Sequence, residues 1–339
     1  MSHQYWRERL VRWLEEEWSV SVTQVTLPGR YFSWRFRGNS LTLSHDERLS
    51  RPYDLIIATS MTDLATLIGL QPGLSGIPVI LYFHENQFAY PDQSPERQVE
   101  RQITSIYSAI AATQLVFNSE FNRETFSTGA QSLLARMPDG VPEGVVTGLA
   151  AKSEVIPVAI DANPSDNVRS NQLSIVWNHR WEHDKGLDEL EMIVDGLLAR
   201  GEEFTFHLVG QNFRQVPQQI ARVRRKLGNH LGQFGYLDER GAYLELLGQS
   251  HVVLSTARHE FQGISVLEAI AAGCRPVVPD DLAYREFVAA ESRFSTTQQA
   301  VELILSQKGK NPVALPVAVQ ALSVAQGWHS LLTSILGEN

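Results

Sequence analysis

Short apolar runs that end in polar or glycine-bearing turns constrain the fold of this 339-residue chain more than any other feature. They are rich in Val, Ile and Leu and occupy residues 54–60, 77–83, 114–119, 173–178, 204–210, 251–256 and 275–280. Uninterrupted apolar runs of this length are typical of parallel strands buried on both faces. Between them, stretches such as 186–201 and 241–250 repeat apolar residues at helical spacing. Strands that alternate with helices predict an α/β chain with doubly wound parallel sheets.

One interruption divides this alternation. Residues 157–172 are polar and rich in Asn, Ser and Asp, which is the composition of a linker. We therefore expect a Rossmann-like domain over residues 1–160, a second one over 161–325, and a final helix over 326–339, for which packing on the first domain is one option. Ligands of open α/β sheets bind beyond the carboxyl ends of the strands, so two such domains that face each other would place a ligand between them.

The composition indicates in which cellular environment the protein is found. The single cysteine, Cys274, excludes internal disulfides and paired-cysteine motifs, which fits a reducing, cytoplasmic location. Residues 1–18 carry charges throughout, which is unlike a secretory signal, and their apolar residues recur at helical spacing, which predicts a helix that faces a core. No apolar run is long enough to span a bilayer. We expect a soluble protein without stable membrane association.

The net charge of -9 argues against broad contact with nucleic acid but leaves two short basic stretches, 30–37 and 222–226. In the first, Phe32, Trp34 and Phe36 alternate with Arg35 and Arg37. A period of two predicts a half-buried strand. Exposed, the same residues would stack on bases and meet phosphates. The pattern alone leaves both interpretations open.

Several common sites are absent from the sequence. It contains no G-x-G-x-x-G, no phosphate-binding P-loop and no G-x-S-x-G. The pairs at 84–85 and 259–260 begin like the zinc motif H-E-x-x-H, but the fifth residues are Phe88 and Gly263. His179 and His183 stand four apart, with Asp184 as a further ligand, yet they follow a predicted strand directly, where a turn is expected. We therefore predict no metal site.

Two segments after predicted strands form a plausible anion site. Arg180 and Lys185 lie between a strand and a helix, where a guanidinium fork and an ammonium suit a diphosphate. In HEFQGISVLEA, residues 259–269, Gly263 allows close backbone approach and the amides of the following helix start would bind an anion. Along a continuous helix, Glu260 and Glu268 would be about 12 Å apart, too far for a cooperating acid–base pair. Glu268 suits the hydroxyls of a ribose, so the residues predict a nucleoside-diphosphate site.

These motifs resemble a known family. Glu260 and Glu268, with Arg180 and Lys185 upstream, are similar to the retaining GT-B enzymes of glycosyltransferase family 4. The segments 82–91, 116–122, 175–186 and 255–269 look like those of the tRNA-queuosine α-mannosyltransferases, and the resemblance extends from about residue 2 to about residue 290. It implies a GT-B fold and transfer of mannose from GDP-mannose to the cyclopentenediol of queuosine in tRNA.

The resemblance also implies roles for individual residues. On the donor side, Arg180 and Lys185 would neutralise the diphosphate, Glu268 would hold the ribose and Glu260 would contact the mannose. The remaining donor candidates are backbone positions at the phosphates or near the base: Gly263, Ile264, Gly235 and Tyr236. His84 is a catalytic candidate from the first domain. The acceptor-side candidates are His84, Glu85, Asn86, Gln87, Asn118, Arg35 and Arg37. Enzymes of this kind need no metal, so we expect none.

One departure from the family and two alternatives remain. Family members begin with a strand and a Gly-Gly-Ser-His turn, whereas here Ser2-His3 follow the initiator methionine, so the N-terminal domain is expected to lack its first strand. One alternative keeps the donor chemistry but transfers the sugar to a lipid or envelope glycan. The other is a nucleotide-sugar-binding protein without transferase activity. The sequence leaves the oligomeric state open.

Overall fold

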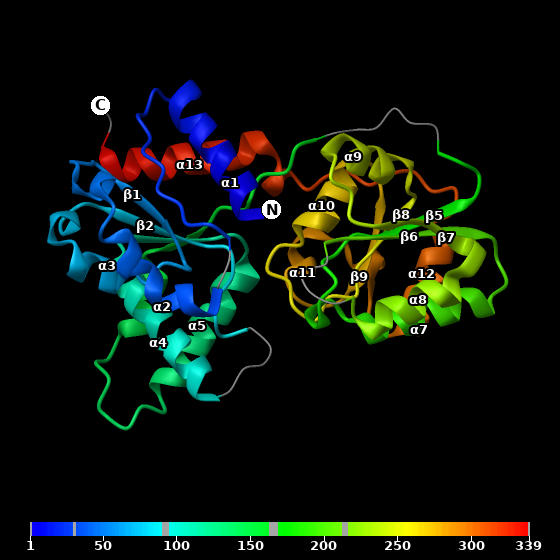
Figure 1. The fold of residues 1–339 in the computed structure, drawn as a ribbon, viewed down its shortest axis with the longest axis horizontal. Coiled ribbons are helices and arrows are strands. Elements are labelled where there is room, and N and C mark those ends of the chain that lie inside the picture. The colour runs from blue at the N-terminus through cyan, green and yellow to red at the C-terminus, as the bar shows by residue number, and fades with distance from the viewer. Residues whose placement is uncertain (1, 30–31, 90–94, 163–168, 212–215, 338–339) are drawn as a thin grey trace. The chain divides into compact units, whose positions relative to one another are not determined.

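The computed structural model describes residues 2–29, 32–89, 95–162, 169–211 and 216–337. The chain forms two compact units, Met1–Val158 with Val324–Asn339, and Ala159–Ser323. Each unit is built on a parallel sheet with helices on its faces (Figure 1). The predicted α/β architecture of two Rossmann-like units is therefore confirmed.

The first unit has a four-stranded parallel sheet in the order β1-β2-β3-β4. Its strands are β1 (Ile56–Thr59), β2 (Val79–Phe83), β3 (Gln114–Phe117) and β4 (Ser153–Val155). Its helices are α1 (Ser2–Arg12), α2 (Phe32–Leu43), α3 (Leu64–Leu70), α4 (Pro95–Ala111), α5 (Glu120–Leu134), α6 (Val145–Ala151) and most of α13 (Ala321–Leu336). Within the described residues, the first strand begins only at Ile56, after α1 and α2.

Strand β2 lies inside this sheet and is buried along its whole length. Leu81 and Phe83 belong to the apolar core that also includes residues of α3, α4 and α5. Tyr82 lies between them in the sequence and so points to the opposite face. There it stacks on Trp6 of α1 and Trp328 of α13, with ring centroids 4.5 and 5.7 Å away. The two terminal helices therefore cover one face of the first sheet.

The second unit has a six-stranded parallel sheet in the order β10-β9-β8-β5-β6-β7. Its strands are β5 (Leu173–Trp177), β6 (Phe204–Val209), β7 (Leu231–Gly235), β8 (Val252–Leu254), β9 (Arg275–Pro279) and β10 (Arg293–Phe294). Its helices are α7 (Leu187–Ala199), α8 (Gln218–Leu227), α9 (Arg240–Gln249), α10 (Ile264–Ala271), α11 (Tyr284–Phe287) and α12 (Thr297–Ser306). Helices α7, α8 and α12 cover one face, and α9 and α10 cover the other (Figure 1).

The strand order of the second sheet positions the site. Strand β5 pairs with both β6 and β8, so the loops that follow these three strands emerge side by side at one edge. The loop after β5 carries Asn178 to Gly186, and the loop after β8 carries Ser255 to Gly263. The two segments singled out from the sequence are thus brought together by the sheet.

The strand predicted as one interpretation of residues 30–37 is wrong. The described part of that stretch begins helix α2, and Trp34 is 70% exposed whereas Phe36 is 4% exposed. The helix is fixed by contacts further along the chain. The Asn39 side chain donates to the Met61 carbonyl and the Ser40 hydroxyl donates to the Asp63 carbonyl, 2.6 Å away for the latter. These buried tertiary bonds override the local alternation of aromatic and basic residues.

Candidate functional site

Lys185 is the buried cation of the loop after β5. Its ammonium group donates to the His259 carbonyl oxygen at 2.8 Å and lies 3.1 Å from the carboxylate of Asp184 and 3.4 Å from that of Glu260. The side chain is only 7% exposed. Burial alone would lower the pKa of Lys185, but the adjacent carboxylates of Glu260 and Asp184 outweigh it and raise the pKa. Lys185 is therefore a fixed positive charge at neutral pH.

The backbone around Lys185 is held tightly against the loop after β8. Thr256 donates its hydroxyl to the Lys185 carbonyl at 2.7 Å and receives the indole N–H of Trp177 at 3.0 Å. Gly186 has φ +64°, and a Cβ there would lie 1.8 Å from the Thr256 carbonyl oxygen. Only glycine permits this close approach. The position of the lysine is thus determined by the packing of two strand-end loops.

Glu260 completes this buried charge cluster. Besides Lys185, its carboxylate accepts the backbone N–H of Phe261 at 3.2 Å and that of Gly263. Burial opposes ionisation of Glu260, but chiefly Lys185, with the Gly263 amide, holds its pKa at about 2. At neutral pH the group is a carboxylate that accepts hydrogen bonds and has no proton to give.

Arg180 lies at the exposed side of the same loop. Its side chain is 47% exposed and pairs with Glu182 at 3.2 Å and with Asp184 at 3.9 Å. Asp184 also contacts Lys185, so a carboxylate lies between the two cations that the sequence singled out. A bound anion would compete with Glu182 and Asp184 for the Arg180 guanidinium. The Lys185 ammonium, in contrast, is already held in position by burial and by its hydrogen bond.

Helix α10 begins beside this cluster. Its preceding residue Gly263 has φ +79°, and a Cβ there would come within 2.7 Å of the Tyr284 ring. The Leu267 N–H is bonded to the Gly263 carbonyl, so the amides of Ile264, Ser265 and Val266 precede the first intrahelical bond. Amides at such a helix start, close to a buried lysine, suit an anionic group.

Glu268 is held on the same helix by partners that sequence reasoning missed. Arg240 of α9 contacts one carboxylate oxygen at 2.7 Å, and the hydroxyl of Tyr243 donates to the other at 3.4 Å. Tyr243 in turn accepts the side-chain N–H of Asn178 at 3.0 Å. Glu260 and Glu268 thus have different partners and belong to separate hydrogen-bond networks. Tyr243 could have been found only by assigning α9 its helical register, because no motif includes it.

Gly235 and Tyr236, predicted near the base, follow β7. Gly235 has φ +102° and its carbonyl accepts the Gly210 N–H at 3.2 Å, which joins the ends of β6 and β7. Tyr236 is 43% exposed. Both residues belong to the same strand-end edge as the charge cluster.

The acceptor-side candidates around β2 lie in a largely buried polar network in the first unit. Asn86 donates to the Asn122 backbone and side-chain oxygens, and its own oxygen accepts the Phe88 N–H at 2.9 Å. Asn118 donates to the His84 carbonyl at 2.9 Å and accepts from the Asn122 side chain at 2.8 Å. These bonds fix the loop after β2 against α5.

Other acceptor-side candidates have varied surroundings. The imidazole of His84 is 6% exposed and packs edge-on against Trp6, with ring centroids 4.8 Å apart. The carbonyls of Glu85 and Gln87 accept side-chain bonds from Ser60 and Gln102 respectively. Arg37 donates to Thr104 at 3.0 Å and lies 3.5 Å from both Asp63 and Glu100. The side chain of Arg35 lies outside the described residues.

The described ranges contain no group of three or more His, Cys, Asp or Glu side chains placed to hold a metal ion. Nor, within those ranges, is any helix both long and apolar enough to cross a membrane.

Comparison with known proteins identifies the family. Residues 1–160 match the model for the N-terminal part of tRNA-queuosine alpha-mannosyltransferases, and residues 161–304 match glycosyl transferases group 1. The chain is 32% identical to the tRNA-queuosine alpha-mannosyltransferase of Drosophila melanogaster over 285 residues, which cover 80% of this chain and 75% of that protein. The chain belongs to the tRNA-queuosine α-mannosyltransferase family. It is therefore a hexosyltransferase.

Two more distant comparisons place this family member in a wider context. It is 23% identical to a GDP-mannose:cellobiosyl-diphosphopolyprenol alpha-mannosyltransferase of Xanthomonas campestris, over 63% of this chain and 52% of that protein. A UDP-forming trehalose-phosphate synthase from Burkholderia xenovorans superposes with a TM-score of 0.60 at 15% identity, covering 89% of this chain and 78% of the other. The likeness shows that the mannosyltransferase-family chain has the GT-B fold.

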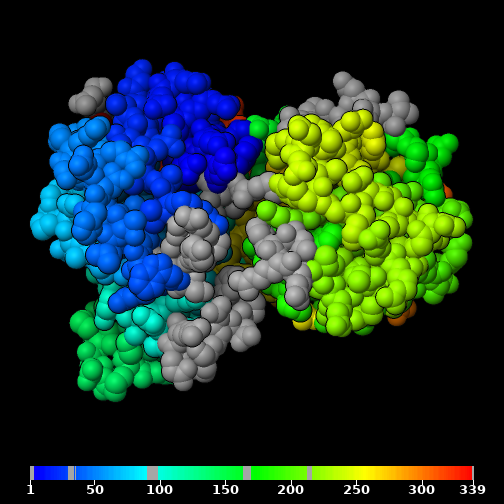
Figure 2. All heavy atoms as spheres, viewed as in Figure 1, coloured from blue at the N-terminus to red at the C-terminus, as the bar shows by residue number. Residues whose placement is uncertain are grey.

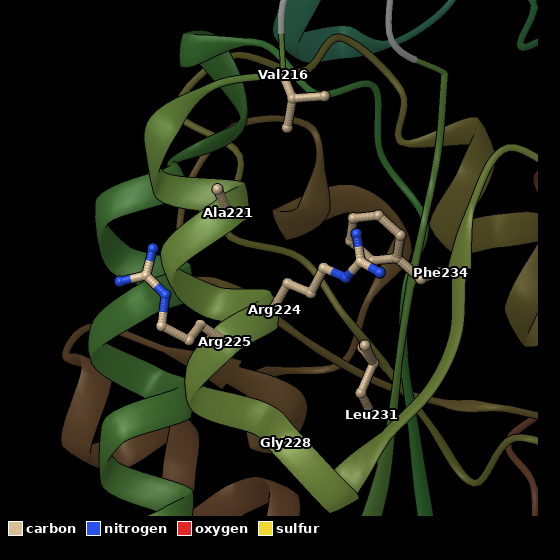
Figure 3. Close-up of a pocket in the computed structure, with 7 residues that line it drawn as sticks. All are labelled: Val216, Ala221, Arg224, Arg225, Gly228, Leu231 and Phe234. Atoms are coloured by element: carbon tan, nitrogen blue, oxygen red, sulfur yellow. The ribbon is translucent and has the colours of Figure 1, made fainter.

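The second basic stretch of this family member lines a surface pocket of about 570 Å³ between α8 and the edge strand β7. Arg224 extends over the Phe234 ring, 4.5 Å from its centroid, while Arg225 points outward from α8 (Figure 3). Their neighbours Arg222 and Lys226 pair instead with Glu191 on α7, at 2.7 and 2.9 Å. In Figure 2, the yellow-green surface around α8 and α9 forms most of the visible face of this unit.

Proposed function

We propose that the protein transfers mannose, with retention of configuration, from GDP-mannose to a cyclopentenediol hydroxyl of queuosine in tRNA. The observation that carries the donor half is the buried Lys185–Glu260 pair beside the open start of α10. The identity with the Drosophila enzyme supports the mannose and the acceptor. The name of the Xanthomonas relative, which is a GDP-mannose enzyme, supports the nucleotide.

The residues divide the donor between them. The diphosphate lies at the amides of Ile264 and Ser265, where Lys185 and Arg180 offset its charge. The Glu268 carboxylate accepts the ribose hydroxyls, since a carboxylate accepts at several lone-pair positions. Glu260, which stays ionised at neutral pH because its pKa is about 2, accepts hydroxyls of the mannose.

The transfer step follows from these charges. The bond between the anomeric carbon and the β-phosphate oxygen breaks, and its electron pair leaves with GDP. The queuosine hydroxyl attacks from the same face, and its proton passes to the departing phosphate, which acts as the base. Lys185 and Arg180 stabilise the charge that grows on that phosphate, and this electrostatic contribution lowers the barrier. Glu260 gives no proton in this scheme.

On the acceptor side, we propose that the loop after β2 serves the tRNA. The bonds among Asn86, Asn118 and Asn122 hold that loop in one conformation. His84 belongs to the same loop, and the rings of Trp6 and Tyr82 set the orientation of its buried imidazole. A cytoplasmic location accompanies this proposal, because the substrate would be tRNA.

The deciding experiment supplies radiolabelled GDP-mannose to the folded protein with queuosine-containing tRNA, with tRNA that lacks queuosine, and with a polyprenol-linked glycan. Label in the first acceptor alone supports the proposal. Label in none of the three, or in the lipid alone, would sink it. Addition of EDTA tests whether the reaction needs a metal ion. We expect unchanged turnover, because cationic side chains take the place of a metal at the phosphates.

A further inference from the structure

Two consecutive buried side chains at the end of β5 each have one polar atom without a described partner. Asn178 and His179 are 7% and 3% exposed. Within the part of the chain that the structure describes, the Oδ1 atom of Asn178 and the Nε2 atom of His179 are buried and make no hydrogen bond. Burying a polar group without a hydrogen-bond partner destabilises the folded state. A buried polar atom of this kind is satisfied by a water molecule or by a ligand.

Both residues are attached to the first turn of α10. The Asn178 amide donates to the Ser265 carbonyl oxygen at 2.8 Å. The Nδ1 atom of His179 lies 3.4 Å from the Ser265 hydroxyl. The amide of Ser265 is one of those that precede the first intrahelical bond of α10. The His179 ring therefore lies against the first turn of α10, where an anion is expected.

The charge state of His179 follows from its surroundings. Burial, and then the positive charge of Lys185, lower the pKa of His179 to about 3, against the opposing effect of Glu260. The ring is therefore neutral at pH 7 and carries one N–H. When the Ser265 hydroxyl donates to Nδ1, that proton resides on Nε2, so the open nitrogen is a donor.

We propose that His179 is a donor-binding residue, whose Nε2–H donates to an oxygen of the diphosphate held at the first turn of α10. The proposal rests on the proposed function only in requiring a nucleoside-diphosphate donor. An N–H group beside the helix start adds a directional hydrogen bond to the attraction that Lys185 exerts on the diphosphate. Because the His179 ring is neutral, it can supply this bond without repelling the lysine.

A packing role for His179 makes the opposite prediction. The imidazole lies edge-on to the Trp177 indole with ring centroids 5.2 Å apart, so an apolar ring can occupy the same place. Replacing a buried unsatisfied polar atom by an apolar one removes its desolvation cost. If His179 only packs, His179→Phe leaves donor affinity unchanged. If it binds the donor, the same variant stays stable but loses affinity.

His207 provides a matched control in the same sheet. Its Nδ1 accepts the Gln233 N–H at 2.9 Å and its Nε2 lies 3.0 Å from the Ser174 hydroxyl, so both nitrogens are already satisfied. His207→Phe should lower the melting temperature, because it leaves those partners unpaired. It should leave nucleotide affinity unchanged, since neither nitrogen is open to a ligand.

The experiment measures binding of GDP, UDP and ADP by calorimetry, together with the melting temperature without nucleotide. For the nucleotide that binds wild type best, His179→Phe should weaken binding about 10-fold to 100-fold at an unchanged or higher melting temperature. His179→Gln, which keeps an N–H donor, should recover part of that affinity. Binding of His179→Phe within twofold of wild type would overturn the proposal.

The outcomes separate this proposal from the proposed function. A wild type that prefers UDP or ADP refutes GDP-mannose as the donor, yet His179 is still judged with the preferred nucleotide. A wild type that binds none of the three overturns both proposals. Should the phenylalanine variant not melt cooperatively, His179→Leu replaces it and is judged by the same two affinity limits.

Discussion

Replacing Lys185 by methionine tests the buried charge cluster most directly. The Lys185 side chain is 7% exposed and its ammonium pairs with both Glu260 and Asp184, so its removal leaves two largely buried carboxylates without their shared cation. Methionine keeps the length and the apolar stem of the side chain. The change in stability of the variant therefore reports the loss of the charge and not the loss of packing.

The magnitude follows from the pKa of Glu260. Burial raises this pKa, yet Lys185 and the local amides lower it from 4.5 to about 2, which corresponds to about 3 kcal/mol. Breaking a buried ion pair on one side typically costs about 3–5 kcal/mol. For a unit of this size, about 3 kcal/mol lowers the melting temperature by roughly 6–12 °C.

The pH dependence has a definite sign. The folded pKa of Glu260 lies below its unfolded value, so its contribution to stability is present above pH 4.5 and is lost as the pH falls toward 2. In Lys185→Met, burial without the cation raises this pKa instead, and protonation relieves the penalty. The gap in melting temperature between wild type and variant should be widest near pH 7 and narrow below pH 4.5.

Scanning calorimetry at pH 7, 5 and 4 measures this gap. Lys226→Met is the matched control: it also removes a lysine with two acidic partners, but its side chain is 35% exposed. Solvent screens exposed ion pairs, so its transition should move little. Lys185→Met/Glu260→Gln should recover part of the loss. A Lys185→Met transition as little changed as that of Lys226→Met, or a gap independent of pH, would refute the reasoning.

Three further predictions concern binding and the backbone. Glu268→Ala should weaken GDP-mannose binding about 10-fold to 100-fold in calorimetry, because charge-assisted bonds to the ribose are lost; unchanged affinity places the ribose elsewhere. Gly263→Ala should destabilise the protein by about 1–2 kcal/mol in thermal melting, since φ is +79° and the new Cβ meets Tyr284; an unchanged melting temperature contradicts this. The pocket between α8 and β7 carries two arginines of the second basic stretch, which we expect to contact tRNA phosphates. Arg224→Glu/Arg225→Glu should therefore weaken tRNA binding and reduce the slope of log affinity against log salt concentration by about two, and an unaltered slope contradicts this contact.

The sequence predicted strands best where they are buried. Strands β2 and β5 are continuous apolar runs because both faces of a central parallel strand are covered. Edge strand β7, with the sequence LGQFG, was missed because its middle residues are exposed and need not be apolar. Helix α2 was not predicted: the two open interpretations of residues 30–37 were a half-buried strand and an exposed stretch that contacts nucleic acid. The basic–aromatic alternation is local, whereas the bonds that fix the helix reach residues 61 and 63.

In the candidate site, too, residues near strand ends could be predicted from local sequence, whereas partners from distant segments could not. Lys185, Glu260 and Gly263 lie in the loops that follow two predicted strands, so strand prediction placed them at strand ends, and the pairing of β5 with β8 brings them together. Arg240 and Tyr243 come from a helix whose register relative to α10 depends on packing, and no spacing rule reports that. Asn178 and His179 stood inside a segment singled out from the sequence, but their importance lies in burial, which only the folded structure displays.

In the proposed ribose site, the partners of Glu268 fix the orientation of its carboxylate. Asn178 donates to Tyr243, and Tyr243 donates to Glu268, so β5, α9 and α10 are joined by consecutive hydrogen bonds. Arg240 takes the other carboxylate oxygen. An ionised carboxylate has about four acceptor positions, of which these two donors occupy two. Two ribose hydroxyls would then meet an acceptor whose orientation is already set, so binding the donor spends little conformational entropy on this side chain.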